Sequence, residues 1–177
     1  MRQTFSRMTL VLGGARSGKS AYAEGLVEAA PAPWLYLATA EAFDDEMRAR
    51  IALHRERRSE NWVTRDAPID LPRAIAGAHG PVLVDCLTLW MTNLILLDAD
   101  VPDAVAALLD ACANAPGPIV LVGNEVGLGI VPDNALARRF RDEAGRLHQR
   151  LAAQADRVIF MVAGLPMTVK PQPGAQA

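Results

Sequence analysis

The sequence predicts one α/β domain built on a mainly parallel sheet flanked by helices, and three observations support this. Short apolar runs suited to buried parallel strands alternate with segments of helical pattern along the chain. The first apolar run leads into a glycine-rich turn and then a helical segment. The length of 177 residues suits one domain, with no internal repeat or linker, so the domain is expected to span residues 1–177.

The first half of the chain is expected to contribute two strands, a short extended piece and three helices. The strands are 8–12 and Trp34–Ala38, the extended piece is 62–64, and the helices are 20–30, 41–58 and 71–78. Both strands are short apolar runs. Pro31 and Pro33 end the first helix, because proline cannot continue one. The highly charged segment 41–58 places Met47 and Ile51 at helical spacing, which indicates an amphipathic helix.

The second half is expected to alternate three strands with three helices. The strands are Val82–Asp85, 118–122 and Arg157–Val162, and the helices are 86–97, 102–115 and 133–155. Segment 86–97 is apolar without a clean period, and we expect a helix because parallel strands need a crossover connection. Pro102 suits the first turn of its helix, and Asp133 is the expected N-cap of the last helix. The tail 168–177 is rich in proline and glycine and is expected to be disordered.

Composition and charge argue against several classes of protein. The formal net charge of −2 disfavours a general binder of nucleic acids or acidic membranes, because both need a basic surface. The two cysteines, Cys86 and Cys112, lack zinc-site spacing and are expected to be buried, reduced thiols. No run reaches the roughly 20 apolar residues of a membrane span, and the apolar run near the amino terminus leads into glycines, as a strand does. A cytoplasmic location is expected.

A phosphate-binding loop of the pattern G-x-x-x-x-G-K-[ST] lies between the first strand and the first helix. Its residues are Gly13, Gly14, Ala15, Arg16, Ser17, Gly18, Lys19 and Ser20. Glycines let backbone N–H groups close around phosphate oxygens, and the helix directs its positive end at the same anion. Lys19 is expected to neutralise the β- and γ-phosphates, and Ser20 to offer its hydroxyl to Mg2+. The alternative is a glycine-rich turn that binds nothing.

Asp85 ends the apolar run VLVD and is a second candidate for the metal site. In phosphate-loop proteins a carboxylate at the end of a neighbouring strand completes the Mg2+ site, directly or through water. The alternative is an ordinary strand-end aspartate that caps the next helix. The chain has no N-K-x-D guanine-reading motif, which argues against a signalling GTPase.

Five stretches of the chain carry a more specific resemblance than the phosphate loop. They are GGARSGKS, YLATAEAFDDEMRARIALHRERR, W-x-T-x-x-x-P, VLVDCLTLWMTNLI and GNEVGLGIVPDNALARRFRDEAGRLHQRLA, within about residues 8–165. In this order they resemble the bifunctional adenosylcobinamide kinase / adenosylcobinamide-phosphate guanylyltransferase family of cobalamin biosynthesis. The resemblance implies a RecA-like P-loop NTPase fold and a homotrimer.

The resemblance implies two reactions on one polypeptide. ATP or GTP phosphorylates the aminopropanol hydroxyl of adenosylcobinamide, and GTP then donates GMP to that phosphate, which gives adenosyl-GDP-cobinamide and pyrophosphate. The second reaction is implied to pass through a GMP–histidine intermediate, and the matching residue is His54. A neutral imidazole attacks phosphorus well and leaves well, and the surrounding arginines suit a triphosphate. From the residues alone, the alternative is a partly buried helical histidine among solvated arginines.

The resemblance also implies nucleotide contacts beyond the loop. They are Thr39, Ala40, Glu41, Arg55, Glu56, Arg57, Arg58, Asp66 and Asp85. Residues 39–41 follow the second strand at the carboxyl edge, where open parallel sheets bind ligands, although a plain strand-to-helix turn is the alternative. Asp66 stands where relatives commonly have glutamate, and the position of Asp85 can be glutamate in other members. Gly123 stands where serine or threonine is more usual.

Three questions stay open at the level of sequence. Asn124 and Glu125 follow another strand and could sense a γ-phosphate, hold the corrinoid alcohol, or serve only the loop. A single-function small-molecule kinase would use the phosphate loop and Asp85 and leave His54 without a role. A RecA-like module that couples NTP hydrolysis to assembly is less favoured, because the chain is short and lacks an aromatic stacking platform. The sequence does not decide between ATP and GTP for the kinase step.

Overall fold

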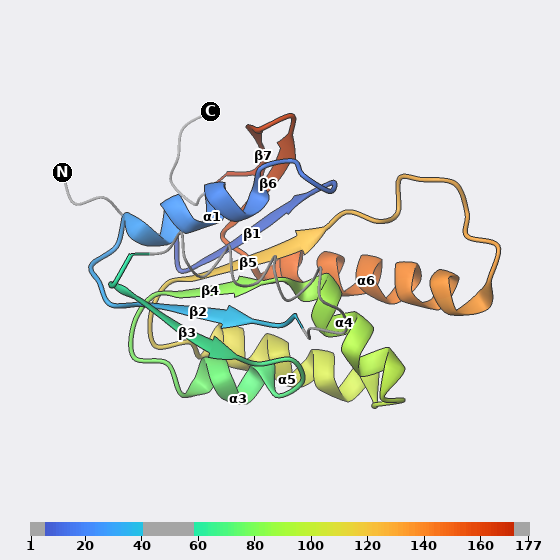
Figure 1. The fold of residues 1–177 in the computed structure, drawn as a ribbon, viewed down its shortest axis with the longest axis horizontal. Helices are drawn as coiled ribbons and strands as arrows, with labels where there is room; N and C mark the ends of the chain where they lie inside the picture. Colours follow the sequence, from blue (N-terminus) through green and yellow to red (C-terminus); the bar gives the residue numbers. More distant parts are fainter. Residues whose placement is uncertain (1–5, 41–58, 172–177) are drawn as a thin grey trace.

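The computed structural model describes residues 6–40 and 59–171. Within these residues a seven-stranded sheet crosses the molecule in the order β3-β2-β4-β5-β1-β6-β7 (Figure 1). The strands are β1 (Met8–Gly13), β2 (Trp34–Ala38), β3 (Trp62–Asp66), β4 (Val82–Asp85), β5 (Ile119–Asn124), β6 (Arg157–Val162) and β7 (Leu165–Lys170). Neighbouring strands are parallel except β6 and β7. The predicted α/β class with a mainly parallel sheet is confirmed.

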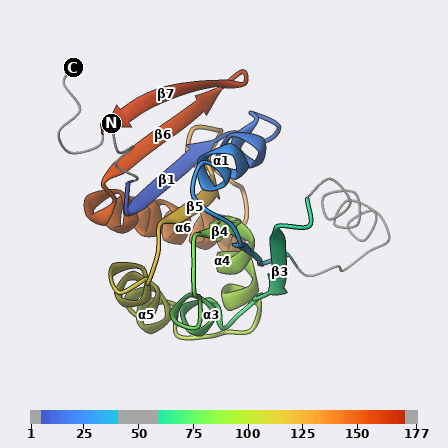
Figure 2. The same ribbon diagram turned by 90° about the vertical axis from the view of Figure 1, so that its left-hand side faces the viewer.

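Helices cover both faces of this sheet (Figures 1 and 2). The helices are α1 (Lys19–Glu28), α3 (Leu71–Ala76), α4 (Leu87–Leu96), α5 (Val101–Ala113) and α6 (Ala135–Gln154). Helix α1 covers one face, and the other four cover the opposite face. Strand β1 explains the two layers, because successive side chains of a strand point to opposite faces. Leu10 packs into the four-helix side, whereas Val11 packs with Ala23 and Val27 of α1.

The carboxyl end of the chain differs from the expectation. Residues 168–170 were expected in a disordered tail, but they belong to β7, which pairs antiparallel with β6. Ala163 and Gly164 connect the two strands, with φ of 51° and 81°. Two consecutive residues of positive φ suit a tight hairpin, whose twist matches that of the strands. The side chains of β7 are mostly exposed, so this edge strand buries no apolar face. Residues 172–177 lie outside the described residues.

Two other expectations are resolved in detail. The last helix begins at Ala135, and Asn134 is its N-cap, because the Asn134 side chain accepts a hydrogen bond from the Ala137 N–H at 2.8 Å. The prediction of Asp133 as the N-cap is therefore wrong by one residue. The extended piece expected at 62–64 is the start of the full strand β3. The amphipathic helix expected at 41–58 lies outside the described residues.

The cysteine prediction is confirmed. Cys86 and Cys112 are buried and free. Burial raises the pKa of the Cys112 thiol to about 12, so this group is a neutral part of the core at ordinary pH. In residues 6–40 and 59–171, no helix combines the length and the apolar character needed to cross a bilayer.

Candidate active site

The phosphate loop links the end of β1 to the start of α1, and two glycines make its shape possible. Gly13 has a φ of 155°, and a Cβ there would lie 2.7 Å from both the Met161 carbonyl oxygen and Ser17 Oγ. Gly18 has a φ of 91° and precedes the first residue of α1. Only glycine adopts such backbone conformations readily, so both positions require it. The N-terminus of α1 therefore faces the space enclosed by the loop.

Lys19 crosses the loop from the first turn of α1. Its side chain is only 7% exposed. Nζ donates hydrogen bonds to the Gly14 carbonyl oxygen at 2.5 Å and to Ser17 Oγ at 3.4 Å. Burial lowers the pKa of Lys19, while the nearby charge of Asp85 raises it. A phosphate bound in the loop would supply the opposite charge that the carbonyl partner lacks.

Asp85 ends β4, two strands away from β1 in the sheet. The Tyr36 hydroxyl donates a hydrogen bond to Asp85 Oδ2 at 3.0 Å, which holds the carboxylate at the end of its strand. Because β1, β5 and β4 run parallel, Asp85 and the phosphate loop both lie at the carboxyl edge of the sheet. Ser20 lies in the first turn of α1 and is half-buried. The hydroxyl and the carboxylate suit Mg2+, which takes oxygen ligands and few protein groups.

Thr39 connects the ends of β2 and β4. Its hydroxyl donates to the Cys86 carbonyl oxygen at 2.7 Å and accepts from the Cys86 N–H at 2.8 Å. Asn93 of α4 donates to the Thr39 carbonyl oxygen at 2.9 Å. The Thr39 hydroxyl therefore serves the protein backbone, and a nucleotide contact at this position would have to use other atoms. Asn93 was not identified from the sequence, although a buried amide in the apolar helix LTLWMTNLIL is the signal that could have found it.

The end of β5 lies next to the phosphate loop. The Glu125 N–H donates to the Gly13 carbonyl oxygen at 2.9 Å. Asn124 Nδ2 donates to Thr88 Oγ1, also at 2.9 Å, which ties β5 to the start of α4. Glu125 Oε1 accepts from the Gly127 N–H at 2.6 Å. The hydrogen bonds of Asn124 and Glu125 therefore stabilise the loop at the border of the site. The Asn124 amide and the Glu125 carboxylate lie close to the phosphate loop.

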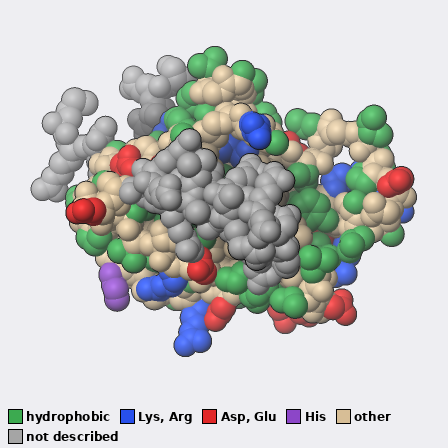
Figure 3. Space-filling model, in the orientation of Figure 1, with side chains coloured by type: hydrophobic (Ala, Val, Ile, Leu, Met, Phe, Trp, Pro, Cys, Tyr) green, Lys and Arg blue, Asp and Glu red, His purple; other side chains and the backbone are tan. Residues whose placement is uncertain are grey.

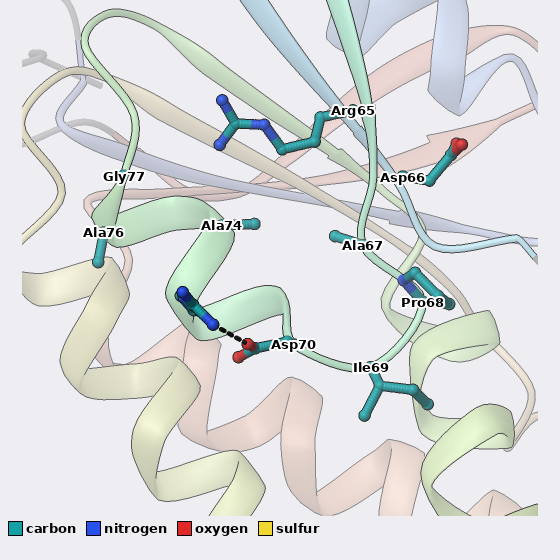
Figure 4. Close-up of a pocket in the computed structure, with 10 residues that line it drawn as sticks. Arg65, Asp66, Ala67, Pro68, Ile69, Asp70, Ala74, Ala76 and Gly77 are labelled. Carbon is teal, nitrogen blue, oxygen red and sulfur yellow. Dashed lines mark ion pairs between the residues drawn. The ribbon is translucent and has the colours of Figure 1, made fainter.

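Asp66 lies far from the phosphate loop, at the end of an edge strand of the sheet. It ends the edge strand β3, and β2, β4 and β5 separate that strand from β1. With roughly 4.8 Å between neighbouring strands, four steps give about 19 Å between the two strand ends. Asp66 lines a cavity of about 710 Å³ between β3 and α3, together with Arg65 and Arg73 (Figure 4). A nucleotide held by the loop reaches Asp66 only if it extends along the carboxyl edge of the sheet.

The structure thus brings part of the predicted site together. The loop residues 13–20 and Asp85 lie at one edge, Thr39 and Ala40 follow β2 beside them, and Asp66 lies at the far strand. The remaining predicted residues lie outside the described residues, and they are Glu41, His54, Arg55, Glu56, Arg57 and Arg58. Among the described residues, no three His, Cys, Asp or Glu side chains form a metal cluster.

A phosphate loop between the first strand and first helix of a parallel sheet, with a strand-end carboxylate nearby, defines a P-loop nucleotide-binding protein. Two solved structures share this fold. One is described as a prototypical ATPase from the type III secretion system of pathogenic bacteria, with a TM-score of 0.52, 14% identity and 92% of this chain covered; the chain spans 56% of that protein. The other, Project ID PH0250 from Pyrococcus horikoshii OT3, has a TM-score of 0.54 at 8% identity and covers 93% of this chain and 86% of that one. These similarities support the RecA-like fold.

Sequence comparison identifies the family. The family described as "Cobinamide kinase / cobinamide phosphate guanyltransferase" matches residues 9–169. The chain is 50% identical over 169 residues to the bifunctional adenosylcobalamin biosynthesis protein CobP of Pseudomonas aeruginosa, with 93% of this chain and 98% of that protein covered. It is 42% identical over 181 residues to CobU of Salmonella typhimurium, with 92% and 99% covered. The chain belongs to the cobinamide kinase / cobinamide phosphate guanyltransferase family, as the sequence resemblance predicted.

Proposed function

We propose that this chain performs both family reactions at one nucleotide site centred on the phosphate loop. In the first, ATP or GTP phosphorylates the alcohol of adenosylcobinamide. In the second, GTP transfers GMP to the resulting phosphate and releases pyrophosphate. Family membership supports the pair of reactions. The position of Lys19 is the structural observation that carries the proposal. Its ammonium is buried inside the loop and, within the part of the chain that the structure describes, donates to neutral acceptors, which leaves its charge ready for phosphate.

The kinase step requires position and charge more than covalent chemistry. The loop amides and the N-terminus of α1 bind the phosphates, and Lys19 neutralises charge on the β- and γ-phosphates. Ser20 and Asp85 would hold Mg2+, which supplies positive charge to the phosphate oxygens when bound. The acceptor hydroxyl attacks the γ-phosphorus as the bond to the β-phosphate oxygen breaks, and the hydroxyl proton leaves to solvent or a nearby base.

For the second step we propose that His54 carries GMP. A neutral imidazole nitrogen attacks the α-phosphorus, and the bond from that phosphorus to the pyrophosphate oxygen breaks. An oxygen of adenosylcobinamide phosphate then attacks the same phosphorus, and the phosphorus–nitrogen bond breaks to regenerate His54. Arg55, Arg57 and Arg58 would stabilise the triphosphate charge as pyrophosphate leaves. Glu41, Glu56 and Asp66 are proposed to contact the guanine nucleotide along the edge of the sheet.

The test of this proposal is covalent labelling. Wild-type protein incubated with Mg2+ and α-labelled GTP is expected to keep an acid-labile, alkali-stable label after denaturation, and none from γ-labelled GTP. His54→Ala should lose the label and GMP transfer while keeping part of its kinase activity. His79→Ala is the matched control, because His79 is exposed and outside the site. Label that remains on His54→Ala would reject the histidine assignment and favour a single-function kinase.

We also infer a homotrimer and a cytoplasmic location from the family resemblance. Exposed apolar side chains on the loop between β5 and α6 are compatible with an assembly, and Ile130 there is 98% exposed. Figure 3 shows hydrophobic side chains gathered on this projecting loop, at the right of the view. Sedimentation equilibrium would give the number of chains in the particle, and a monomer at micromolar concentration would contradict the trimer.

A further inference from the structure

A buried histidine that plays no part in the proposed reactions has a nitrogen with no hydrogen-bond partner among the described residues. His148 lies on α6, between the sheet and the helix, and is 6% exposed. Its Nε2 makes no hydrogen bond within the described residues. Leu147 and Leu151 of the same helix pack into the core beside it. A buried nitrogen without a hydrogen bond lowers stability. We therefore ask whether the shape of the imidazole or its chemistry offsets this cost.

The shape of the imidazole matches a missing side chain on β5. A Cβ added at Gly123 would lie 2.6 Å from His148 Nε2 and 3.4 Å from His148 Cδ2. It would also lie 3.1 Å from Leu12 Cδ2 on the neighbouring strand β1. Gly123 does not have a positive φ, so its backbone conformation would accept another residue. In this chain, side chains and not the backbone conformation limit the size of residue 123, and the nearest of them is the imidazole.

Gly123 is followed directly by the residues that join β5 to the phosphate loop. Asn124 is in register with Gly13, the first glycine of the loop. The Glu125 N–H bonds to the Gly13 carbonyl oxygen, and the Asn124 amide bonds to Thr88 Oγ1. Thr88 lies three residues after the strand-end carboxylate of β4. A shift of β5 at Gly123 would therefore move both sides of the nucleotide site.

We propose that His148 is a positioning residue for phosphoryl transfer, which acts through Gly123 and the end of β5. The imidazole packs under the Gly123 backbone and sets the height of Asn124 and Glu125 against the loop. Close-packed interiors transmit small displacements, and a misplacement of about 1 Å in a phosphate-transfer site can lower the rate by up to ~10²-fold. The side-chain volumes at positions 123 and 148 are then coupled: residue 123 must be small because the imidazole of residue 148 fills the space beside it.

The charge state of the imidazole agrees with a packing role. Burial lowers the pKa of His148, although the charge of Glu125 partly opposes this effect. The side chain is therefore neutral near pH 7. The proposed pairing depends on side-chain volume, so it can be tested by enlarging residue 123 and shrinking residue 148.

The first test enlarges one partner and then shrinks the other. Gly123→Ala is expected to lower kcat for cobinamide phosphorylation about 10- to 100-fold. Adding His148→Ala to Gly123→Ala should restore at least a third of the wild-type kcat, because the new methyl group then has space. Gly145→Ala is the matched control on α6, since a Cβ there meets nothing within 4 Å. A kcat for Gly123→Ala within threefold of wild type, or a double variant no better than Gly123→Ala, would overturn the pairing.

The second test separates positioning from stability and does not depend on Gly123→Ala folding. His148→Ala alone should lower kcat about tenfold at a temperature where circular dichroism shows it folded. Leu151→Ala, one turn further along α6 and fully buried, should lower Tm but leave kcat within threefold. Equal kcat losses in both variants would show that His148 is only structural.

The pairing rests on the proposed function, in that the loop must hold the reacting nucleotide. Affinity for a fluorescent GTP analogue, measured on the same variants, needs no acceptor and keeps the two ideas apart. Wild-type protein that binds nucleotide but does not phosphorylate cobinamide would reject the proposed reaction. In that case the pairing stands if Gly123→Ala weakens binding and the double variant restores it, and fails if the affinities are equal.

Discussion

Replacing Lys19 by methionine removes the ammonium of the phosphate loop but keeps most of its apolar stem. The stem is buried, and within residues 6–40 and 59–171 Nζ bonds to the Gly14 carbonyl oxygen and Ser17 Oγ. Burial lowers the pKa of Lys19, so the fold disfavours the charge that methionine removes. We therefore expect Lys19→Met to keep the wild-type Tm or exceed it while losing kinase activity.

The size of the loss follows from the buried position of the charge. An ammonium about 4 Å from a phosphate charge contributes about 4 kcal/mol at an effective dielectric constant of ~20. Because about 1.36 kcal/mol corresponds to a tenfold change in rate, the expected loss in kcat/KM approaches ~10³-fold. In bulk water the same pair would contribute only about 1 kcal/mol, so a loss of about fivefold would indicate a solvent-exposed contact.

The assay is phosphorylation of cobinamide at saturating nucleotide, with products resolved by mass. Lys170→Met is the matched control, since Lys170 is the other of the two lysines in the chain and also donates to backbone carbonyl oxygens, those of Ala152 and Ala153. It should keep full activity. If Lys19→Met stays folded and retains kcat/KM within threefold of wild type, the assignment of the phosphate loop is wrong.

Three further predictions concern the loop, the metal site and the buried histidine. Gly13→Ala should lower the free energy of unfolding in urea by about 2–4 kcal/mol, because its Cβ would lie 2.7 Å from the Met161 carbonyl oxygen, whereas Gly14→Ala should have little effect. Asp85→Asn should raise the Mg2+ concentration for half-maximal activity about tenfold or more and change stability by less than about 1 kcal/mol. An unchanged Mg2+ titration would exclude Asp85 from the metal site and leave it only the hydrogen bond from the Tyr36 hydroxyl. Burial lowers the pKa of His148, so its unfolded state binds a proton first, and stability should be full above about pH 6.5 and fall as pH drops below it. His148→Gln should weaken this fall in urea denaturation at pH 5.5 against pH 7.5, and identical pH dependence would exclude His148 as its source.

Local sequence patterns predict the elements that depend on neighbouring residues. The strands Trp34–Ala38, Val82–Asp85 and Arg157–Val162 have the predicted bounds, because buried parallel strands are short apolar runs with sharp polar or glycine ends. The phosphate loop could be predicted because its backbone shape needs glycine at fixed spacing. The family could be predicted because long ordered stretches carry far more information than four loop positions. His54 and its arginines stay a prediction that rests on that resemblance.

Features that depend on contacts between distant segments could not be predicted from the sequence. The strand order places Asp66 four strands from the loop, and no local pattern encodes strand order. Strand β7 was missed because its exposed residues pair only with β6 and bury no apolar face of their own. The nucleotide contact of Thr39 stays a prediction, and the structure adds that its hydroxyl bonds to the backbone of Cys86, just after β4. Gly123 and His148 are 25 positions apart, so their shared volume became visible only when α6 packed against the sheet. Packing between side chains of separate elements depends on the three-dimensional fold, and this packing fixes the positions of the groups around the phosphate loop.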